Sequence, residues 1–447
     1  MLTRFINHLA SKTPPEILSQ RVNTMPRSYF DWRKQTSFRS LVRYVSRNSP
    51  FYKRKFKEFG INPDRVRSPK DLGDFYTMPD DIIQNAEEFL CQKPHIVFES
   101  SGTTSRNKRV YFTQDELDQI GKYNAIGFYG LGLTKEDRFV NAFDFCIWIP
   151  GMITQKGFEK AGIFGMAAGK IDPLEVYRRI PVYGFNVIFG EPTWLIKLTE
   201  IAEKHGSYPL KMLIGGAEAM PDAARPWMER VWQGAKVRMT YGTVESGGTL
   251  AFELDPICQH YHINENSFWM EILNPDPEGY GEVVFTTLDR RTMPLIHYRN
   301  RDISRIVEEK CPCGLPYRRL EKIRGRADEM VIASGGNLYP LMFEGILNDI
   351  PGISKDWQVI VKLNGFKEVM EFNLESSLSS GDRSAIKEKI FSNIQNLYPD
   401  LWKNYSLEIF HLEFMYHSPG SLRVNRKMIR LVDQRIYSQG NGASLSR

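Results

Sequence analysis

The feature that most constrains the fold of this chain is a repeated order of short apolar run, loop and helix between about residues 95 and 300. Residues 186–190 form one apolar run, and a helix is predicted to begin near Pro192. Residues 211–216 form the next run, and a helix is predicted from near Pro221, while a third run at 237–242 ends in a loop. This repeat is typical of an α/β core, whose ligands bind at the carboxyl ends of the strands. The sequence therefore predicts an α/β fold with functional residues in the loops after strands.

The length of 447 residues exceeds what one ordinary hydrophobic core supports, so more than one domain is expected. Residues 1–90 have the apolar spacing of helices, and residues 282–306 read as β-rich. We expect a large N-terminal domain over residues 1–326 and a small C-terminal α+β domain over residues 327–447. In the small domain the pattern predicts helices at 340–349 and 384–397, strands at 357–363, 368–374 and near 407–414, and a disordered tail from about residue 438.

The composition is that of a soluble globular protein, with 42% hydrophobic and 25% charged residues. No apolar run reaches the length of a membrane span, and the N-terminus has no secretory signal pattern. Five cysteines do not make a disulfide framework in a chain of this length. We therefore expect a protein of the reducing cytoplasm without a membrane partner.

The charge is distributed unevenly along the chain. Residues 1–70 carry 16 Lys and Arg against 4 Asp and Glu, a net charge of +12, although the whole chain has a net charge of only +6. Such a segment suits nucleic acid, anionic lipid or a phosphate-rich cofactor, or it is a solvated helical face. We favour the solvated face, and no nucleic-acid partner is expected because no aromatic stacking motif is interleaved with the charges.

A turn rich in hydroxyls and cations follows the short apolar run at residues 95–98. Its hydroxyl donors are Ser100, Ser101, Thr103 and Thr104, and its cations are Arg106, Lys108 and Arg109. Gly102 lets the backbone turn sharply and approach a ligand closely. Because hydroxyls and cations bind phosphate oxygens, the turn is a candidate polyphosphate site. It lacks the second Gly and the Gly-Lys pair of the P-loop, and an ordinary surface turn is the alternative.

Three further candidates lie later in the chain. The carboxylate of Glu245, in the loop 241–245, suits Mg²⁺, which bridges triphosphate oxygens and takes few protein ligands. Tyr241 offers a flat face for a base, although a packed tyrosine beside a turn glutamate is the alternative. Asp302 ends a predicted strand, where it is placed to accept hydrogen bonds from ribose hydroxyls. Spacing alone would make Lys427 a surface residue.

Six motifs occur in the order found in adenylate-forming enzymes. They are Ser-Ser-Gly-Thr-Thr at 100–104, Gly-Gly-Ala-Glu at 215–218, Tyr-Gly-x-x-Glu at 241–245, Tyr-Arg-x-Arg-Asp at 298–302, Gly-Arg-x-Asp at 325–328 and the late Lys427. The chain resembles that superfamily and, within it, the phenylacetate–CoA ligases. The resemblance covers about residues 40–435 and includes segments 49–53, 294–296 and 336–340. Each motif is weak alone, but six in order over this span are strong together.

The resemblance implies a two-step reaction. ATP and a carboxylic acid, here an aryl or arylacetic acid, give an acyl-adenylate and pyrophosphate, and the thiol of CoA then displaces AMP. Residues 100–109 would hold the β- and γ-phosphates, Glu245 would bind Mg²⁺ and Asp302 would bind ribose. Lys427 would stabilise the adenylation transition state, and Asp328 would be the hinge of a mobile C-terminal domain.

The resemblance also implies which residues surround the two substrates. Those expected around the nucleotide are Gly216, Glu218, Tyr241, Gly242, Thr243 and Arg326. Those expected around the acid are Phe143, Phe145, Trp148, Gly215 and Ala217, although such an aromatic stripe is also typical of plain core. Gly335 and Gly336 would face the site where the pantetheine arm of CoA enters.

The chain departs from the family pattern at four positions. Val244 stands where a hydroxyl is expected, His297 where Arg is usual, Ser105 where Gly is common and Ser334 where Arg is common. Two alternatives therefore stay open: the acyl acceptor is an amine or a carrier-protein thiol, or the protein is a non-catalytic binding protein that kept the fold. Retention of Lys427, Glu245 and Asp302 argues against the second. A homodimer is also left open.

A structural zinc site is the last prediction. Cys258, His260 and His262, together with Cys311 and Cys313 of a Cys-Pro-Cys-Gly turn, offer three thiolates and two imidazoles. Tetrahedral zinc needs four such ligands, and four protein ligands leave no open position. His262 aligns better with a histidine of the family, so the favoured set is Cys258, His262, Cys311 and Cys313. Reduced, unligated cysteines are the alternative.

Overall fold

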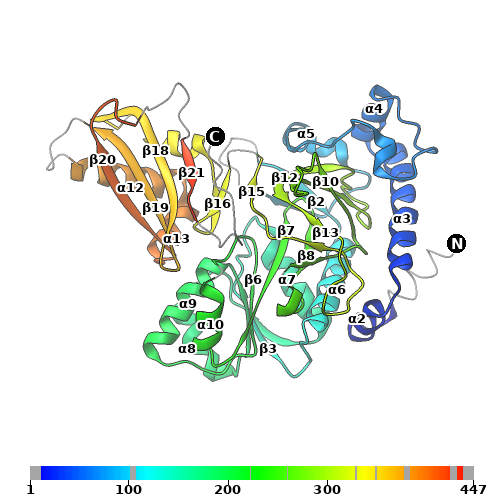
Figure 1. Ribbon diagram of the computed structural model, residues 1–447, viewed down its shortest axis with the longest axis horizontal. Helices are drawn as coiled ribbons and strands as arrows, with labels where there is room; N and C mark the ends of the chain where they lie inside the picture. The colour runs from blue at the N-terminus through cyan, green and yellow to red at the C-terminus, as the bar shows by residue number, and fades with distance from the viewer. Residues whose placement is uncertain are drawn as a thin grey trace.

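The computed structural model describes residues 12–100, 107–221, 223–258, 260–327, 330–347, 350–376, 383–422 and 430–435. Several of the predicted features fall outside these residues. They are the turn residues Ser101, Gly102, Thr103 and Thr104, the hinge residue Asp328, the catalytic Lys427 and the C-terminal tail. The chain forms a large domain and a smaller C-terminal α+β domain, which lie side by side in Figure 1.

The large domain is built around a mixed sheet of nine strands in the order β13-β14-β9-β8-β7-β6-β5-β3-β4. These strands are β3 (Arg138–Asn141), β4 (Phe164–Ala167), β5 (Val187–Gly190), β6 (Met212–Gly215), β7 (Lys236–Thr243), β8 (Gly248–Phe252), β9 (Tyr261–Ile263), β13 (Ile306–Val307) and β14 (Arg319–Leu320). Neighbouring strands from β4 to β7 are parallel, so their carboxyl ends meet at one edge. Strand β8 returns antiparallel to β7. The expected α/β core is confirmed.

Helices cover both faces of the parallel strands. They are α6 (Gln114–Gly130) and α7 (Ile149–Ala161) on one face, and α8 (Pro173–Tyr183), α9 (Pro192–His205) and α10 (Ala224–Val231) on the other. Side chains of a strand alternate between faces. Phe189 accordingly packs with Phe128 and Phe158 on one side, while Ile188 packs with Trp194 on the other. Within the described residues, no helix has the length and apolarity needed to cross a membrane.

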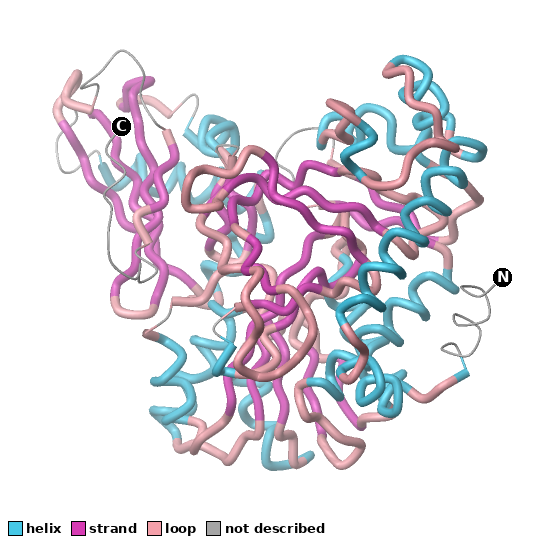
Figure 2. The backbone as a smooth tube through the Cα atoms, turned by 45° about the vertical axis from the view of Figure 1, so that its right-hand side comes forward, coloured by secondary structure: helices cyan, strands magenta, loops and turns pink. Residues whose placement is uncertain are grey.

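Helices from the described part of the first 100 residues pack against a second sheet. Its strands, in the order β10-β11-β12-β15, are β10 (Phe268–Leu273), β11 (Gly281–Thr287), β12 (Tyr298–Ser304) and β15 (Gly325–Arg326), and the separate hairpin has β1 (Ile96–Glu99) and β2 (Arg109–Phe112). The N-terminal helices are α2 (Pro15–Asn23), α3 (Arg27–Asn48), α4 (Pro50–Glu58) and α5 (Pro79–Asn85), with short 3-10 turns at Pro69–Leu72 and Ala86–Phe89. A third 3-10 turn, Pro256–Cys258, lies between β8 and β9. Phe38 and Phe51 from these helices share one core with Phe285 and Tyr298 of the sheet. Figure 2 shows the helices along one side of the strands.

The small domain has its own apolar core. Its sheet has the order β20-β19-β18-β21, and a separate hairpin precedes it. The elements are β16 (Val331–Ala333), β17 (Gly336–Leu338), α11 (Pro340–Leu347), β18 (Ile353–Asn364), β19 (Lys367–Ser376), α12 (Arg383–Leu397), α13 (Pro399–Ser406), β20 (Phe410–His417) and β21 (Leu431–Asp433). Phe343, Val359, Phe372 and Ile390 pack together in it.

One predicted strand of the small domain is shifted. The strand expected near residues 407–414 begins at Phe410, because helix α13 occupies Pro399–Ser406. Pro399 stands at the start of that helix, where its fixed φ is favourable. The boundary expected between residues 326 and 327 stays a prediction.

Candidate active site

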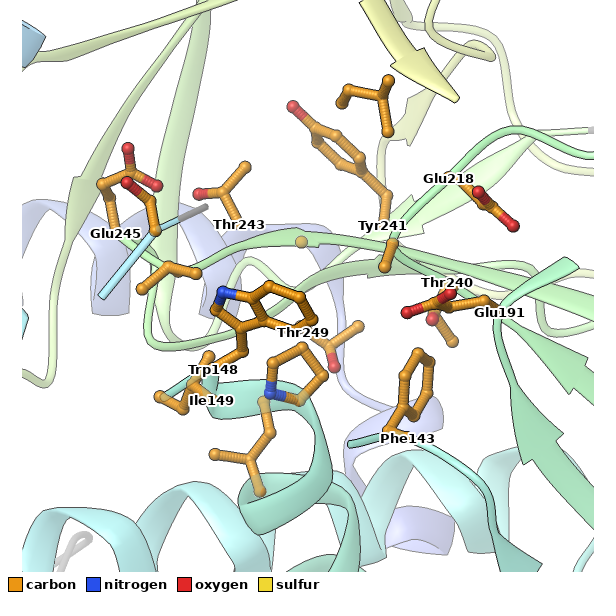
Figure 3. Close-up of a pocket in the computed structure, with 18 of the residues that line it drawn as sticks. Phe143, Trp148, Ile149, Glu191, Glu218, Thr240, Tyr241, Thr243, Glu245 and Thr249 are labelled. Atoms are coloured by element: carbon orange, nitrogen blue, oxygen red, sulfur yellow. The ribbon is translucent and has the colours of Figure 1, made fainter. Parts of the chain in front are cut away.

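A pocket lies at the carboxyl edge of the parallel strands, where the small domain meets the large one. Strand β7 and the turn after it provide one wall, with Tyr241, Thr243 and Glu245 (Figure 3). Residues at the start of helix α7 provide a second wall, with Trp148 and Ile149. The small domain contributes Ile332, Gly335 and Gly336. The site therefore depends on both domains, as expected for ligands at the ends of parallel strands.

Glu245 is buried beside Lys108. Of the cations that the sequence placed in or next to the 101–106 turn, Lys108 is the one that the described pocket lining contains. The carboxylate is 3% exposed, and its Oε1 contacts Lys108 Nζ and accepts a 2.9 Å hydrogen bond from the Tyr298 hydroxyl. Burial acts to raise the pKa of Glu245, but the Lys108 ammonium together with hydrogen bonds from the backbone and from Tyr298 holds that pKa below its ordinary value. The structure thus brings the predicted Mg²⁺ ligand and a predicted phosphate-binding cation together.

Residues 101–106 lie outside the described residues, but the two strands that flank them are described, and β1 and β2 end at the register pair of Glu99 with Arg109. Ser100 lines the pocket, and its backbone N–H donates to the carbonyl of Lys108 over 3.0 Å. Arg109 behaves differently from the sequence prediction. Its Nη1 and Nη2 donate to the two carboxylate oxygens of Glu87 over 2.5 and 3.2 Å, and it lies outside the pocket lining, because neighbouring side chains of a strand point to opposite faces.

Asp302 is held by three donors. Arg326 Nη1 donates to its Oδ1 over 2.6 Å, and the Tyr241 hydroxyl and Asn300 Nδ2 donate to its Oδ2 over 2.6 Å each. Burial raises the pKa of Asp302 despite the neighbouring Arg326. The sequence placed this residue at the end of a strand, but it lies inside β12 and pairs with Arg326 of β15. Asn300 and Arg326 line the pocket above it.

The residues expected around the acid divide into two groups. Phe143, Trp148 and Ala217 line the pocket. Phe145 lies outside that lining with 37% of its surface exposed, and Gly215 also lies outside it. A Cβ on Gly215 would lie 2.5 Å from the sulfur of Met239, so this glycine serves packing between β6 and β7.

Trp148 carries an unpaired donor at the pocket wall. Its indole N–H is buried and has no hydrogen-bond partner among the residues that the structure describes. A buried donor of this kind is available to an acceptor on a ligand. Thr249, drawn near Trp148 in Figure 3, donates its hydroxyl to Asn124 Oδ1 over 3.3 Å.

The predicted metal ligands converge away from this pocket. The ligand atoms of Cys258, His262, Cys311 and Cys313 all lie within 4.8 Å of one another. Cys313 Sγ is 3.4 Å from His262 Nε2 and 3.2 Å from Cys311 Sγ. The pairing of β9 with β14 brings these distant segments together. His260 is not part of this group.

The sequence analysis missed a group of buried charges where the small domain touches the large one. Lys170 and Glu191 form a buried ion pair, and Asn404 of helix α13 lies beside them. Glu191 follows strand β5 directly, so its position at a strand end was an available signal. Nothing in the local sequence marks Lys170 or Asn404.

The chain matches several curated proteins over most of its length, although no family model matches it. A phenylacetate–coenzyme A ligase of Thermus thermophilus is 29% identical over 380 residues, which are 80% of this chain and 83% of that protein. The enzyme of the same name from Pseudomonas putida is 27% identical over 79% of this chain and 84% of its own length, and that of Escherichia coli 28% over 76% and 80%. The chain is homologous to the phenylacetate–coenzyme A ligases. The resemblance drawn from the six motifs is thereby confirmed.

Solved structures show the same fold at lower identity. A 2-hydroxyisobutyryl-CoA ligase in complex with 2-HIB-AMP and CoA in the thioesterification state is 20% identical, with a TM-score of 0.79 over 93% of this chain and 92% of that one. The same ligase in its postadenylation state gives a TM-score of 0.64, with 93% and 91% coverage. The described chain thus superimposes better on that ligase in its thioesterification state than in its postadenylation state. The amide bond synthetase McbA from Marinactinospora thermotolerans has a TM-score of 0.51 at 16% identity, over 71% of this chain and 65% of that one.

Proposed function

We propose that this protein uses ATP to convert a carboxylic acid to an acyl-adenylate and then transfers the acyl group to the thiol of CoA. The observation that carries the proposal is a single pocket lined by a charged pair, Lys108 and Glu245, and by two aromatic residues, Phe143 and Trp148. Gly335 and Gly336 of the small domain line the same pocket. Homology to the phenylacetate–coenzyme A ligases over about four fifths of the chain supports the reaction class. The aromatic wall supports an aryl or arylacetic acid as substrate.

In the first step the acid carboxylate attacks the α-phosphorus of ATP and pyrophosphate leaves. The two reactants repel one another, so the site must offset their negative charge. Lys108 lies at the pocket beside Glu245 and would bind phosphate oxygens as they approach. Lys427 is proposed to stabilise the transition state at the α-phosphate, and Asp328 to act as the hinge of the small domain.

A magnesium ion fits the residues at the β7–β8 turn. Lys108 and Tyr298 both contact Oε1 of Glu245, so Oε2 is the oxygen that would bind the ion. Because Glu245 lines the pocket, its carboxylate and the phosphate oxygens of ATP could bind the same cation. Such an ion supplies charge neutralisation for the departing pyrophosphate. Asp302, Tyr241 and Arg326 are proposed to bind the ribose and base through the network that they form.

In the second step the CoA thiol attacks the acyl carbonyl and AMP leaves. Gly335 and Gly336 line the pocket on the small-domain side, and we propose that the pantetheine arm enters there. Ser334, which stands where the family commonly has Arg, is buried beside this entrance.

A structural zinc ion fits the second cluster. Zinc bonds of about 2.0 to 2.3 Å place tetrahedral ligand atoms about 3.5 to 3.8 Å apart, which is close to the separations of the four thiol and imidazole atoms. Held by Cys258, His262, Cys311 and Cys313, the ion would tie the loop after β13 to β9.

The test of the proposed function is ATP–pyrophosphate exchange with a library of aryl, arylacetic and aliphatic acids. We expect exchange that depends on one class of acid and falls at least about a hundredfold in Lys427→Ala. Release of AMP is then measured with CoA, an amine or a carrier protein added. AMP release only with an amine or a carrier protein would move the acceptor away from CoA. No exchange with any acid, or exchange unchanged in Lys427→Ala, would contradict the proposal.

A further inference from the structure

The turn of the β16–β17 hairpin is buried against the large domain. Ser334 and Gly335 form this turn with positive φ angles of 56° and 73°. Asn404 Nδ2 donates to the carbonyl of Ser334 over 2.9 Å and to that of Gly335 over 3.3 Å. The backbone N–H of Ser334 donates to Glu368, which Arg435 also contacts. The small domain therefore holds its own turn in a fixed shape.

The surface that receives this turn leaves no room for a side chain on Gly335. A Cβ there would lie 2.5 Å from Lys170 Nζ and 2.9 Å from Glu191 Oε2, both in the large domain. It would also lie 2.7 Å from Asn404 Nδ2. Glycine is required twice at this position, because of its φ angle and because of the close approach of the two domains.

Glu218 is the group of the large domain that bonds directly to the turn. Its Oε2 accepts a 3.1 Å hydrogen bond from the backbone N–H of Gly335, and its Oε1 accepts a 2.7 Å bond from the backbone N–H of Thr193. The hydroxyl of Thr193 also donates to Oε1. Glu218 is 8% exposed, so both contacts are shielded from water. The carboxyl group bridges the start of helix α9 and the small-domain turn.

This bridge exists in the domain placement that resembles the thioesterification state, for which the TM-score of 0.79 exceeds the 0.64 of the postadenylation state. A contact between the domains stabilises only the placement in which it forms. We propose that Glu218 is a positioning residue for acyl transfer, which docks the Ser334–Gly335 turn on the large domain after the adenylate has formed. This inference rests on the proposed function and adds a second role for a residue that the sequence predicted to lie near the bound substrates.

Docking also changes the protonation of Glu218. Burial, followed by the nearby carboxylates of Glu368 and Glu191, raises the pKa of Glu218 to about 8, while Thr193 and Lys170 oppose this rise. Arg435 contacts Glu368 and is the cation paired with that second carboxylate. In a placement that exposes the carboxyl, its pKa returns to near 4.5, the ordinary value for Glu. Docking is therefore coupled to the uptake of a proton by Glu218. It is most favourable below pH 4.5, where the carboxyl group is protonated in both placements, and it is weakened as the pH rises through about 8, the pKa of the docked form.

The experiment measures the two half-reactions separately, as pyrophosphate exchange and as CoA-dependent thioester formation from preformed acyl-adenylate. Glu218→Ala removes the bridge, and we expect thioester formation to fall about tenfold or more relative to exchange. Gly335→Ala, whose Cβ meets Lys170 only in the docked placement, should give the same selective loss. Lys367→Ala removes a partly buried ion pair with Glu200 between the same domains, away from the turn, and should change the ratio less than about twofold.

A pH series supplies a readout that loss of packing would not give. We compare the rate of thioester formation by the wild-type protein with that of Glu218→Gln at each pH. The ratio of wild type to variant should fall between pH 6 and 9, because the carboxyl group of Glu218 titrates and the amide of Gln does not. Equal loss of both half-reactions in Glu218→Ala and Gly335→Ala, or a ratio independent of pH, would overturn the inference. Absence of acid-dependent exchange in the wild-type protein would instead overturn the proposed function.

Discussion

The hydroxyl of Tyr241 donates a 2.6 Å hydrogen bond to Oδ2 of Asp302, which ties the nine-stranded sheet to the four-stranded one at the pocket. Tyr241 lies on β7 and Asp302 on β12. Asn300 Nδ2 donates to both oxygens, over 2.7 Å to the tyrosine and 2.6 Å to the aspartate. The motifs at 241–245 and 298–302, both predicted to contact the nucleotide, are thus joined by one hydrogen-bond network, in which Tyr241 and Asp302 orient one another's side chains.

The first prediction concerns this bond. Tyr241→Phe leaves buried Asp302 with one donor fewer, so the free energy of unfolding should fall by about 1 to 3 kcal/mol. Urea unfolding measures the change. Tyr183→Phe is the matched control, because Tyr183 is 41% exposed and its loss should change stability by less than about 0.5 kcal/mol. A Tyr241→Phe protein as stable as this control would show that the bond does not hold the two sheets together.

The second prediction concerns the pair of Lys108 and Glu245. Lys108→Ala leaves a buried carboxylate without its cation, which should lower the free energy of unfolding by about 3 to 5 kcal/mol. The double variant Lys108→Ala/Glu245→Ala should recover much of that stability, because no unpaired charge remains. Pyrophosphate exchange should stay at least about a hundredfold below wild type in both variants. A double variant no more stable than the single one would contradict the role of charge pairing.

Much of the fold follows from local patterns in the sequence. The runs at 186–190 and 211–216 become β5 (Val187–Gly190) and β6 (Met212–Gly215), because each apolar run precedes a turn and a helix. Helix α13 was not predicted, since its eight residues, Pro399–Ser406, are too few for a clear helical period. The shift of β20 follows from that omission.

The candidate site was predictable where motifs carry the chemistry and not where tertiary contacts do. Glu245 lines the pocket and the four metal-ligand candidates lie together, while the roles that the motifs assign to them stay predictions. Arg109 and Phe145 lie outside the pocket because the strand or loop turns them away, which residue type does not reveal. The contact of Glu218 with Gly335 joins residues 117 positions apart and has no local signal.

The third prediction concerns acid stability. Arg27 and Arg318 bond to Glu265 over 2.7 and 2.9 Å and, against the opposing effect of burial, lower its pKa to about 2. This lowered pKa adds about 3 kcal/mol to the free energy of unfolding above pH 4.5, and the contribution is lost as the pH falls towards about 2. The difference in stability between wild type and Glu265→Gln should therefore shrink by about half or more between pH 6 and pH 3.

Urea unfolding at the two pH values measures that difference. Glu175→Gln, on the exposed surface of helix α8, serves as the control and should show little change at either pH. A difference for Glu265→Gln that stays constant from pH 6 to pH 3 would show that Glu265 does not titrate in this range.

The fourth prediction concerns the metal cluster. Freshly purified protein should contain one equivalent of zinc by elemental analysis, and a chelator should lower its unfolding temperature. Cys311→Ser should lose the metal and show the same lowered temperature without chelator. Cys146→Ser is the control, because Cys146 is exposed and lies outside the cluster. Protein free of zinc and indifferent to chelator would leave the four residues as a reduced, unligated group.

The most direct measurement for the whole account is a crystal structure with a non-hydrolysable acyl-adenylate analogue of the acid that gives exchange. We expect the analogue between the β7–β8 turn and the Ser334–Gly335 turn, with its phosphate-like group near Lys108, its ribose at Asp302 and its acyl group against Trp148. An analogue bound elsewhere, or a pocket left empty at saturating concentration, would contradict it.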